Sequence, residues 1–153
     1  MNIRSFSRAR LNAAKMQVSA GLRLATVGHN TRALLKPFDD GIYLHQVIEK
    51  RNGAITRYSD LAQAFAALDT SASDGREWRV HYHIPLFLDD LGAFSSTQSF
   101  VREALALHRQ DPISQHLEVQ TYTWGVPPER YRATAIAPTI ARELQWVRRQ
   151  FPA

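Results

Sequence analysis

Two histidines, His81 and His83, stand two residues apart in a segment that otherwise alternates like a β-strand. Side chains at positions i and i+2 of a strand project from the same face, so both imidazoles are expected to point the same way. This spacing suits two ligands of a divalent metal, or one ligand and one contact to a substrate. It also suits two hydrogen-bonded surface histidines, and the pattern alone leaves both interpretations open.

A carboxylate and an amide interrupt two other apolar segments. Glu118 lies between Leu117 and Val119, where burying a carboxylate costs free energy unless a cation or a hydrogen-bond donor compensates. Gln17 occupies a predicted strand of its own. These groups can converge with the histidine pair on one site. If the strand face that carries Glu118 is open to water, Glu118 is an ordinary surface residue.

His45 and Trp124 are further candidates for contacts to a substrate. His45 belongs to a predicted hairpin, where local packing is the simpler role. Trp124 follows a predicted strand and would either cap a pocket or cover the end of the strand, and cover is the role we favour.

The strands that would position these groups follow from alternation and turn signals. They are predicted over residues 15–19, over 42–50 and 54–58 as a hairpin, and over 78–84 and 116–122. Asn52-Gly53 joins the two hairpin segments, because this dipeptide readily adopts the positive φ angles of a type I′ turn. Ala20-Gly21 is expected to end the first strand, and Pro85 the strand that carries the histidines.

Three helices are expected between and after these strands. Ser59 is a good N-cap for the first, and Ser95 to Gln98 has the spacing of a capping box for the second. Pro138 suits the first turn of the third. The apolar faces are expected to contain Phe100, Ala104, Leu105 and His108 in the second helix, and Ile140, Leu144, Val147 and Phe151 in the third. The alternating order of strands and helices favours a parallel α/β arrangement.

Composition excludes several classes of function. The chain has 153 residues, of which 44% are hydrophobic and 22% charged, as in one globular domain. It contains no cysteine, which excludes disulfides, thiolate metal sites and a cysteine nucleophile. A net charge of +5 invites nucleic acid as a partner, but no basic cluster is interleaved with aromatic residues as a single-strand groove requires. We therefore rank nucleic-acid binding low.

The N-terminal residues 1–14 form an irregular basic leader, rich in Arg and Ser. Such a segment fits a transit peptide, a surface arm or a frayed, non-native leader. No apolar run approaches the roughly 20 residues of a transmembrane helix, and no apolar signal-peptide region follows Met1. We therefore expect a cytoplasmic protein without a membrane span.

From Lys15 onward the chain resembles the metabolite traffic protein EboE family, which belongs to the xylose isomerase-like TIM barrels. The resemblance lies in KMQVS (15–19), YLHQV (43–47), VHYHIPLF (80–87), STQ (96–98) and LEVQTYTW (117–124). It implies that residues 15–153 form the C-terminal strands and helices of such a barrel. A closed barrel usually needs about 250 residues, so only part of one is expected here.

The resemblance also implies roles for individual residues. In this superfamily a divalent metal (Mn, Zn or Mg) is held at the C-terminal ends of the later strands. Glu118 matches the last-strand glutamate, which binds metal and moves a proton in isomerases and epimerases. His83 resembles a metal-binding histidine of the endonuclease branch, and His81 stands at an aspartate position. Gln17 stands where relatives place a histidine, and its neutral amide is a weaker ligand.

The earlier strands, with their own carboxylates, are absent from this sequence. The metal site is therefore expected to be incomplete, and this chain alone is expected to be inactive. Either a separate polypeptide supplies the rest of the barrel, or the chain is a truncated product. The open edge of such a fragment favours self-association.

The sequence leaves three possible functions. The first is a metal-dependent sugar or sugar-phosphate isomerase or epimerase associated with metabolite traffic. The second, favoured by Gln17, is a non-enzymatic module that binds a small polar metabolite. The third and lowest ranked is an apurinic-site endonuclease-like phosphodiesterase.

Overall fold

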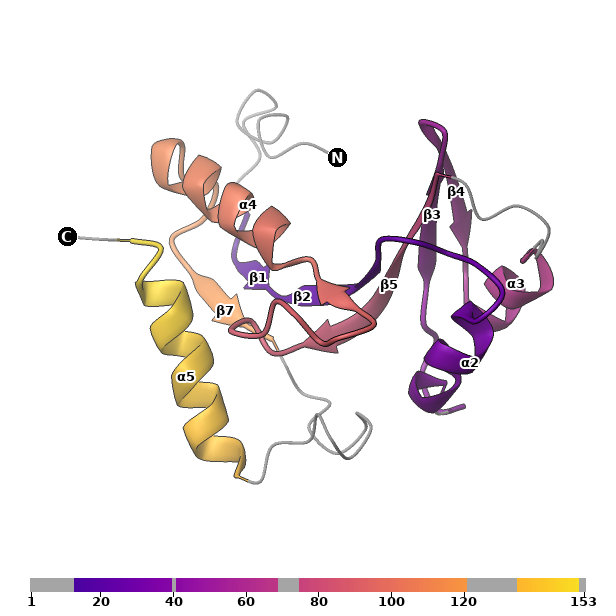
Figure 1. The fold of residues 1–153 in the computed structure, drawn as a ribbon. Helices are drawn as coiled ribbons and strands as arrows, with labels where there is room; N and C mark the ends of the chain where they lie inside the picture. The colour runs from indigo at the N-terminus through magenta and orange to yellow at the C-terminus, as the bar shows by residue number, and fades with distance from the viewer. Residues whose placement is uncertain (1–12, 40, 69–74, 121–134, 152–153) are drawn as a thin grey trace.

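The computed structural model describes residues 13–39, 41–68, 75–120 and 135–151, which form a mixed α/β fold (Figure 1). The strands are β1 (Met16–Val18), β2 (Ala20–Leu24), β3 (Val47–Arg51), β4 (Ala54–Tyr58), β5 (Arg76–Ile84), β6 (Ser95–Ser96) and β7 (Leu117–Val119). The helices are α2 (Thr31–Leu35), α3 (Leu61–Ala66), α4 (Gln98–Gln110) and α5 (Ile136–Arg148), together with the 3-10 helix η1 (Lys36–Phe38).

The larger sheet has five strands in the order β4-β3-β5-β2-β6, all of them antiparallel to their neighbours. Its hairpin confirms the turn at Asn52-Gly53, where the two φ angles are 49° and 85°. The strand predicted from Ile42 begins only at Val47. The parallel arrangement expected from the order of elements is therefore wrong for this sheet.

Alternation along β5 builds the main core. Trp78, Val80, Tyr82 and Ile84 are buried on one face of the strand, against side chains that include Leu22, Leu24, Val47 and Phe38. The opposite face carries Arg79, His81 and His83, which are exposed or half-buried. Pro85 follows the last residue of β5, as the sequence predicts. Local periodicity thus sets which side of this strand faces solvent.

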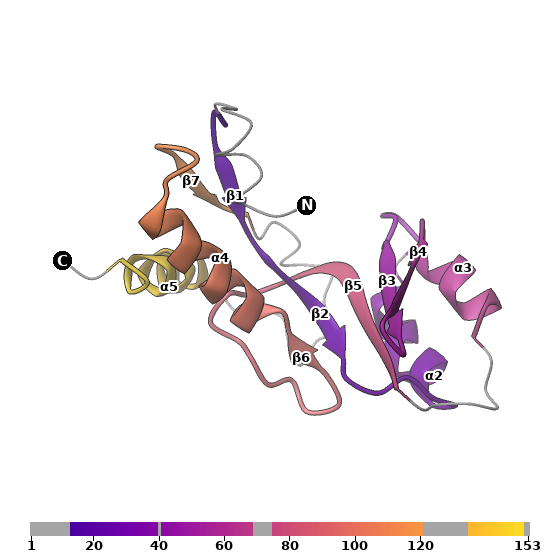
Figure 2. The same cartoon turned by 90° about the horizontal axis from the view of Figure 1, so that it is seen from above.

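A second, two-stranded sheet pairs β1 with β7 in parallel. Helices α4 and α5 lie beside it, and α2 and α3 lie at the far end of the molecule near β3 and β4 (Figures 1 and 2). A second hydrophobic core lies at the β1–β7 sheet and contains Val18, Ala20, Leu86, Val101, Leu105, Trp146 and Val147. Within the described residues the two sheets do not close into a barrel.

The chain passes directly from one sheet to the other at Ser19. The first strand, β1, ends at Val18, just before Ala20-Gly21 as predicted, but Ala20-Gly21 opens a further strand, β2, which runs on to Leu24. Pairing with β5 shifts register between Ala20 and Leu22. A Cβ at Gly21 would lie 3.0 Å from the carbonyl oxygen of Val80, so glycine permits the close approach at this irregularity.

The helices differ from expectation mainly in their caps and in the side they bury. Asp60 rather than Ser59 is the N-cap of α3, and Thr97 is the N-cap of α4, without the side-chain bond expected of a capping box. Ala104, Leu105 and His108 are buried as predicted, but Phe100 is 57% exposed. In α5 the predicted apolar face is only partly covered, since Ile140 and Leu144 are exposed.

Candidate functional site

Gln17 and Glu118 are brought together by the parallel pairing of β1 and β7, in which they are direct partners. Both side chains are exposed, on the face of the sheet opposite the buried Val18. Lys15 Nζ donates to the Glu118 carboxylate at 2.5 Å. This bond, aided by a bond from Gln17, lowers the pKa of Glu118 below its ordinary value. Glu118 is therefore an ionised, paired surface carboxylate.

Ser19 and His83 meet just beyond the carboxyl ends of β1 and β7. The Nδ1 atom of His83 lies 2.5 Å from Ser19 Oγ and 3.0 Å from the carbonyl oxygen of Gln120. One imidazole thus joins three segments that are distant in sequence. Ser19 follows Gln17 by two residues, and Gln120 follows Glu118 by two, so the sheet continues one polar face through all four positions.

The contacts of His83 restrict its tautomer. A carbonyl oxygen can only accept, so the bond to Gln120 requires a proton on Nδ1, and the basic lone pair of the neutral ring then lies on Nε2. Burial lowers the pKa of His83, and proximity to His81 lowers it further. The neutral imidazole is therefore favoured at neutral pH.

His81 lies beside His83, with the two ring centroids 5.1 Å apart. The expectation that the pair shares one face of β5 is confirmed. His81 is exposed, whereas His83 is half-buried.

Replacing His81 with Gln is expected to raise the pKa of His83, because the electrostatic effect of His81, which lowers that pKa in addition to burial, is removed. A lowered pKa in the folded state means that the unfolded chain takes up this proton first, so folding weakens as pH falls through the histidine range. NMR titration of the His83 Cε1 proton in wild type and His81→Gln measures the shift. An unchanged or lower pKa in the variant would contradict it.

His45 is buried and packs against the ring of Tyr82, with centroids 5.1 Å apart. Its backbone N–H donates to the Asp60 carboxylate at 2.9 Å. Tyr82 projects from the face of β5 opposite to His81 and His83, so His45 lies apart from the polar face. Trp124, the other predicted substrate contact, falls outside the described residues.

The predicted metal ligands therefore lie in two pairs, His81 with His83 and Gln17 with Glu118. Within the part of the chain that the structure describes, no three His, Asp or Glu side chains come together as a metal-binding group. The ammonium of Lys15 also occupies the carboxylate that would bind a cation. The predicted ligands that the structure describes do not by themselves make a complete divalent-metal site.

Sequence reasoning missed the residues that hold the segment after His83. The backbone N–H of Leu86 donates to Glu143 Oε1 at 2.9 Å, and Gln98 Nε2 donates to the Leu86 carbonyl at 2.6 Å. Both α4 and α5 thereby fix the turn that follows β5. One signal was present for Glu143, which stands three residues after Ile140 and four before Val147, on the predicted apolar face.

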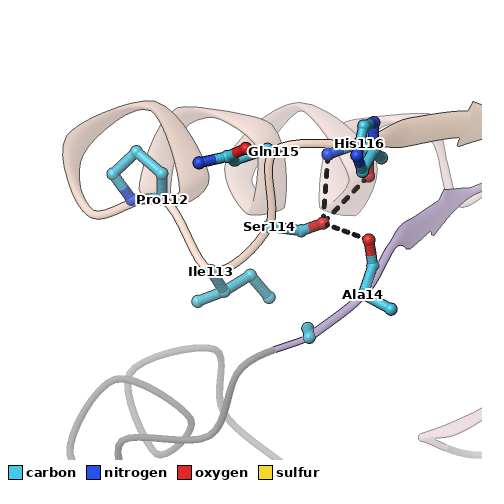
Figure 3. A pocket seen from close by; sticks show the side chains of 7 residues that line it. Ala14, Pro112, Ile113, Ser114, Gln115 and His116 are labelled. Atoms are coloured by element: carbon cyan, nitrogen blue, oxygen red, sulfur yellow. Dashed lines mark hydrogen bonds between the residues drawn. The ribbon is translucent and has the colours of Figure 1, made fainter.

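A pocket of about 480 Å³ lies at the other end of the parallel pair, where β1 and β7 begin (Figure 3). The Ser114 hydroxyl is part of the pocket lining. It donates to the carbonyl oxygen of Ala14 at 3.2 Å and accepts from the backbone N–H of His116 at 3.1 Å. None of the predicted site residues lines this pocket. In α/β sheets ligands bind at the carboxyl ends of strands, so the face around Ser19 and His83 is the better candidate.

Among the described residues, no helix is both long and apolar enough to cross a membrane. No protein-family model matches this chain, and comparison with curated proteins and with solved structures finds no significant match.

Proposed function

We propose that this chain is the C-terminal part of a xylose isomerase-like barrel and that it binds a small polar metabolite, a sugar being the first candidate, in the cytoplasm. The observation that carries the proposal is the convergence of Ser19, His83 and Gln120 at the carboxyl ends of the parallel strands. Gln17 and Glu118 extend the same face. The proposed ligand lies across this face.

The arrangement of β1, β7, α4 and α5 supports the barrel part of the proposal. The two short strands β1 and β7 are parallel, and the helices pack against the apolar side of that sheet. A single helical layer outside a parallel sheet is the building unit of an α/β barrel. The polar face would then point toward the barrel interior.

The chemistry of the face suits sugar hydroxyls. The carboxylate accepts hydrogen bonds, and the amide and imidazole groups both donate and accept them, as sites for polar ligands require. The Lys15 ammonium beside Glu118 adds a cationic donor next to an anionic acceptor. His83 is held in place by its Nδ1 contacts, which lowers the entropy lost when a ligand binds.

The test uses NMR of the full chain with a panel of aldoses, ketoses and their phosphates, observed at the His83 Cε1 proton and, in every variant including His83→Ala, at the Cε1 proton of the neighbouring His81. We expect saturable shifts with at least one sugar. Ser19→Ala and His83→Ala should each weaken binding by about tenfold or more, because each removes part of the bonded set. His29→Ala, at an exposed histidine between β2 and α2, is the matched control and should leave affinity unchanged.

Two results would reject binding at this face. One is a panel in which no sugar shifts the His83 signal. The other is a bound sugar whose affinity is the same in wild type, Ser19→Ala and His83→Ala.

A second candidate is a metal-dependent sugar isomerase or epimerase, favoured by the close pairing of His81 with His83 on the same side as Glu118. A divalent cation would polarise a substrate oxygen there. The described residues supply an incomplete ligand set, so this candidate requires further ligands beyond them. Native mass spectrometry with added Mn²⁺ or Zn²⁺ separates the candidates: bound metal that is lost in Glu118→Ala favours the enzyme, and no bound metal in either protein favours the binder.

A further inference from the structure

Helix α5 exposes a continuous apolar stripe. Ile136, Ile140 and Leu144 recur at intervals of four residues and are 57%, 39% and 49% exposed. The helix is held to the molecule by a neighbouring strip that includes Trp146 and Val147. Large aliphatic side chains at helical spacing are normally covered, so this stripe marks an interaction surface.

The stripe leads into a groove of about 650 Å³ between α5 and β7. Its lining consists of Leu117, Val119, Ala141, Leu144, Gln145, Val147, Arg148 and Phe151. Figures 1 and 2 show α5 close to β7 along this side of the molecule. The groove therefore has an apolar floor built from a strand and a helix.

The outer edge of β7 gives the groove a second property. Among the described strands, β7 is hydrogen-bonded to β1 alone. The bonds from Met16 to the His116 carbonyl and from Gln120 to the Val18 carbonyl show that even-numbered positions of this segment face β1. In a parallel strand the alternate residues, Leu117 and Val119, then direct their peptide groups to the other edge. An extended chain is the occupant that such an edge pairs with.

The charge around the groove favours a different polypeptide, rather than a second copy of this chain, as its occupant. Arg148, which lines the groove, and Arg149, which follows the last residue of α5, are both exposed, whereas the only acid of α5, Glu143, is fully buried. A second copy would bring the same cations to the interface. An acidic segment would be attracted, most strongly at low salt.

We infer that this groove binds an extended segment of another polypeptide, with alternating apolar residues and acidic flanks, added as a strand to the edge of β7. The surface lies on the helical side of the β1–β7 sheet and shares none of the residues proposed to bind the metabolite. Failure of one proposal therefore leaves the other standing.

Fluorescence anisotropy tests the inference with the full chain and a labelled peptide of sequence Glu-Glu-Val-Thr-Val-Thr-Val-Glu-Glu. We expect saturable binding that weakens as salt rises. Replacing the four glutamates with lysine, or the central valine with proline, should weaken it about tenfold or more, through lost attraction and lost strand pairing respectively. Arg148→Glu should weaken binding of the acidic peptide and improve binding of the lysine peptide. Arg57→Glu, the same charge change on exposed β4, should do neither.

Binding to anionic vesicles and self-association measured by sedimentation are the results that would contradict the inference. The inference is overturned by no peptide binding up to about 1 mM. It is equally overturned by association with phosphatidylserine vesicles without peptide binding, which would make α5 a membrane-surface helix. Self-association that strengthens with salt and excludes the peptide would show that a second copy occupies the groove.

Discussion

Glu49→Ala is expected to lower the free energy of unfolding by about 3–5 kcal/mol, the usual cost of removing one partner of a buried ion pair. Glu49 Oε2 accepts from Arg76 Nη2 at 2.7 Å, from Arg76 Nε at 3.0 Å and from Trp78 Nε1 at 2.6 Å. The side chains of Glu49 and Arg76 are only 7% and 2% exposed. The substitution removes the carboxylate that compensates a buried guanidinium and an indole N–H. Urea unfolding followed by Trp fluorescence measures the loss.

Glu77→Ala supplies the matched control, because Glu77 lies on β5, the strand that pairs with the β3 strand of Glu49. Glu77 bonds Arg23 at 2.6 Å and Arg79 at 3.0 Å, but these arginine side chains are 36% and 47% exposed. Pairs open to water contribute about 1 kcal/mol or less. A loss in Glu49→Ala no larger than that in Glu77→Ala would mean that the buried carboxylate does not hold β3 against β5.

Glu143→Ala is expected to lower the free energy of unfolding by about 2–4 kcal/mol, since it removes the acceptor of a buried backbone N–H and leaves unfilled space. Glu143 is fully buried and holds Leu86, three residues after His83. We expect the same variant to broaden or shift the His83 NMR signal, because the turn after β5 loses its attachment to α5. Thermal unfolding together with the NMR spectrum measures both effects.

Glu143→Gln distinguishes the hydrogen bond from charge. A glutamine keeps an oxygen acceptor at the same reach, so it should recover most of the stability lost in the alanine variant. Equal losses in Glu143→Ala and Glu143→Gln would indicate that the ionised carboxylate, rather than the bond to Leu86, holds α5.

Local sequence signals determined the individual elements well. Alternation placed His81 and His83 on the open face of β5 and Tyr82 on the buried face, because the side-chain period of a strand is fixed by backbone geometry. Asn52-Gly53 determined the hairpin for a similar reason, since few other dipeptides adopt its two positive φ angles. Pro85 stopped β5 because it carries no N–H for the ladder.

Only the tertiary structure decided how these elements combine. Periodicity describes one segment at a time, so it could not show that β2 continues past Gly21 into an antiparallel sheet, or that α5 buries Thr139 and Glu143 while Leu144 stays exposed. The meeting of Ser19, His83 and Gln120 was likewise hidden, because it joins residues separated by 64 and 37 positions. Such contacts depend on which strands become neighbours, and that choice is made by packing of the whole chain.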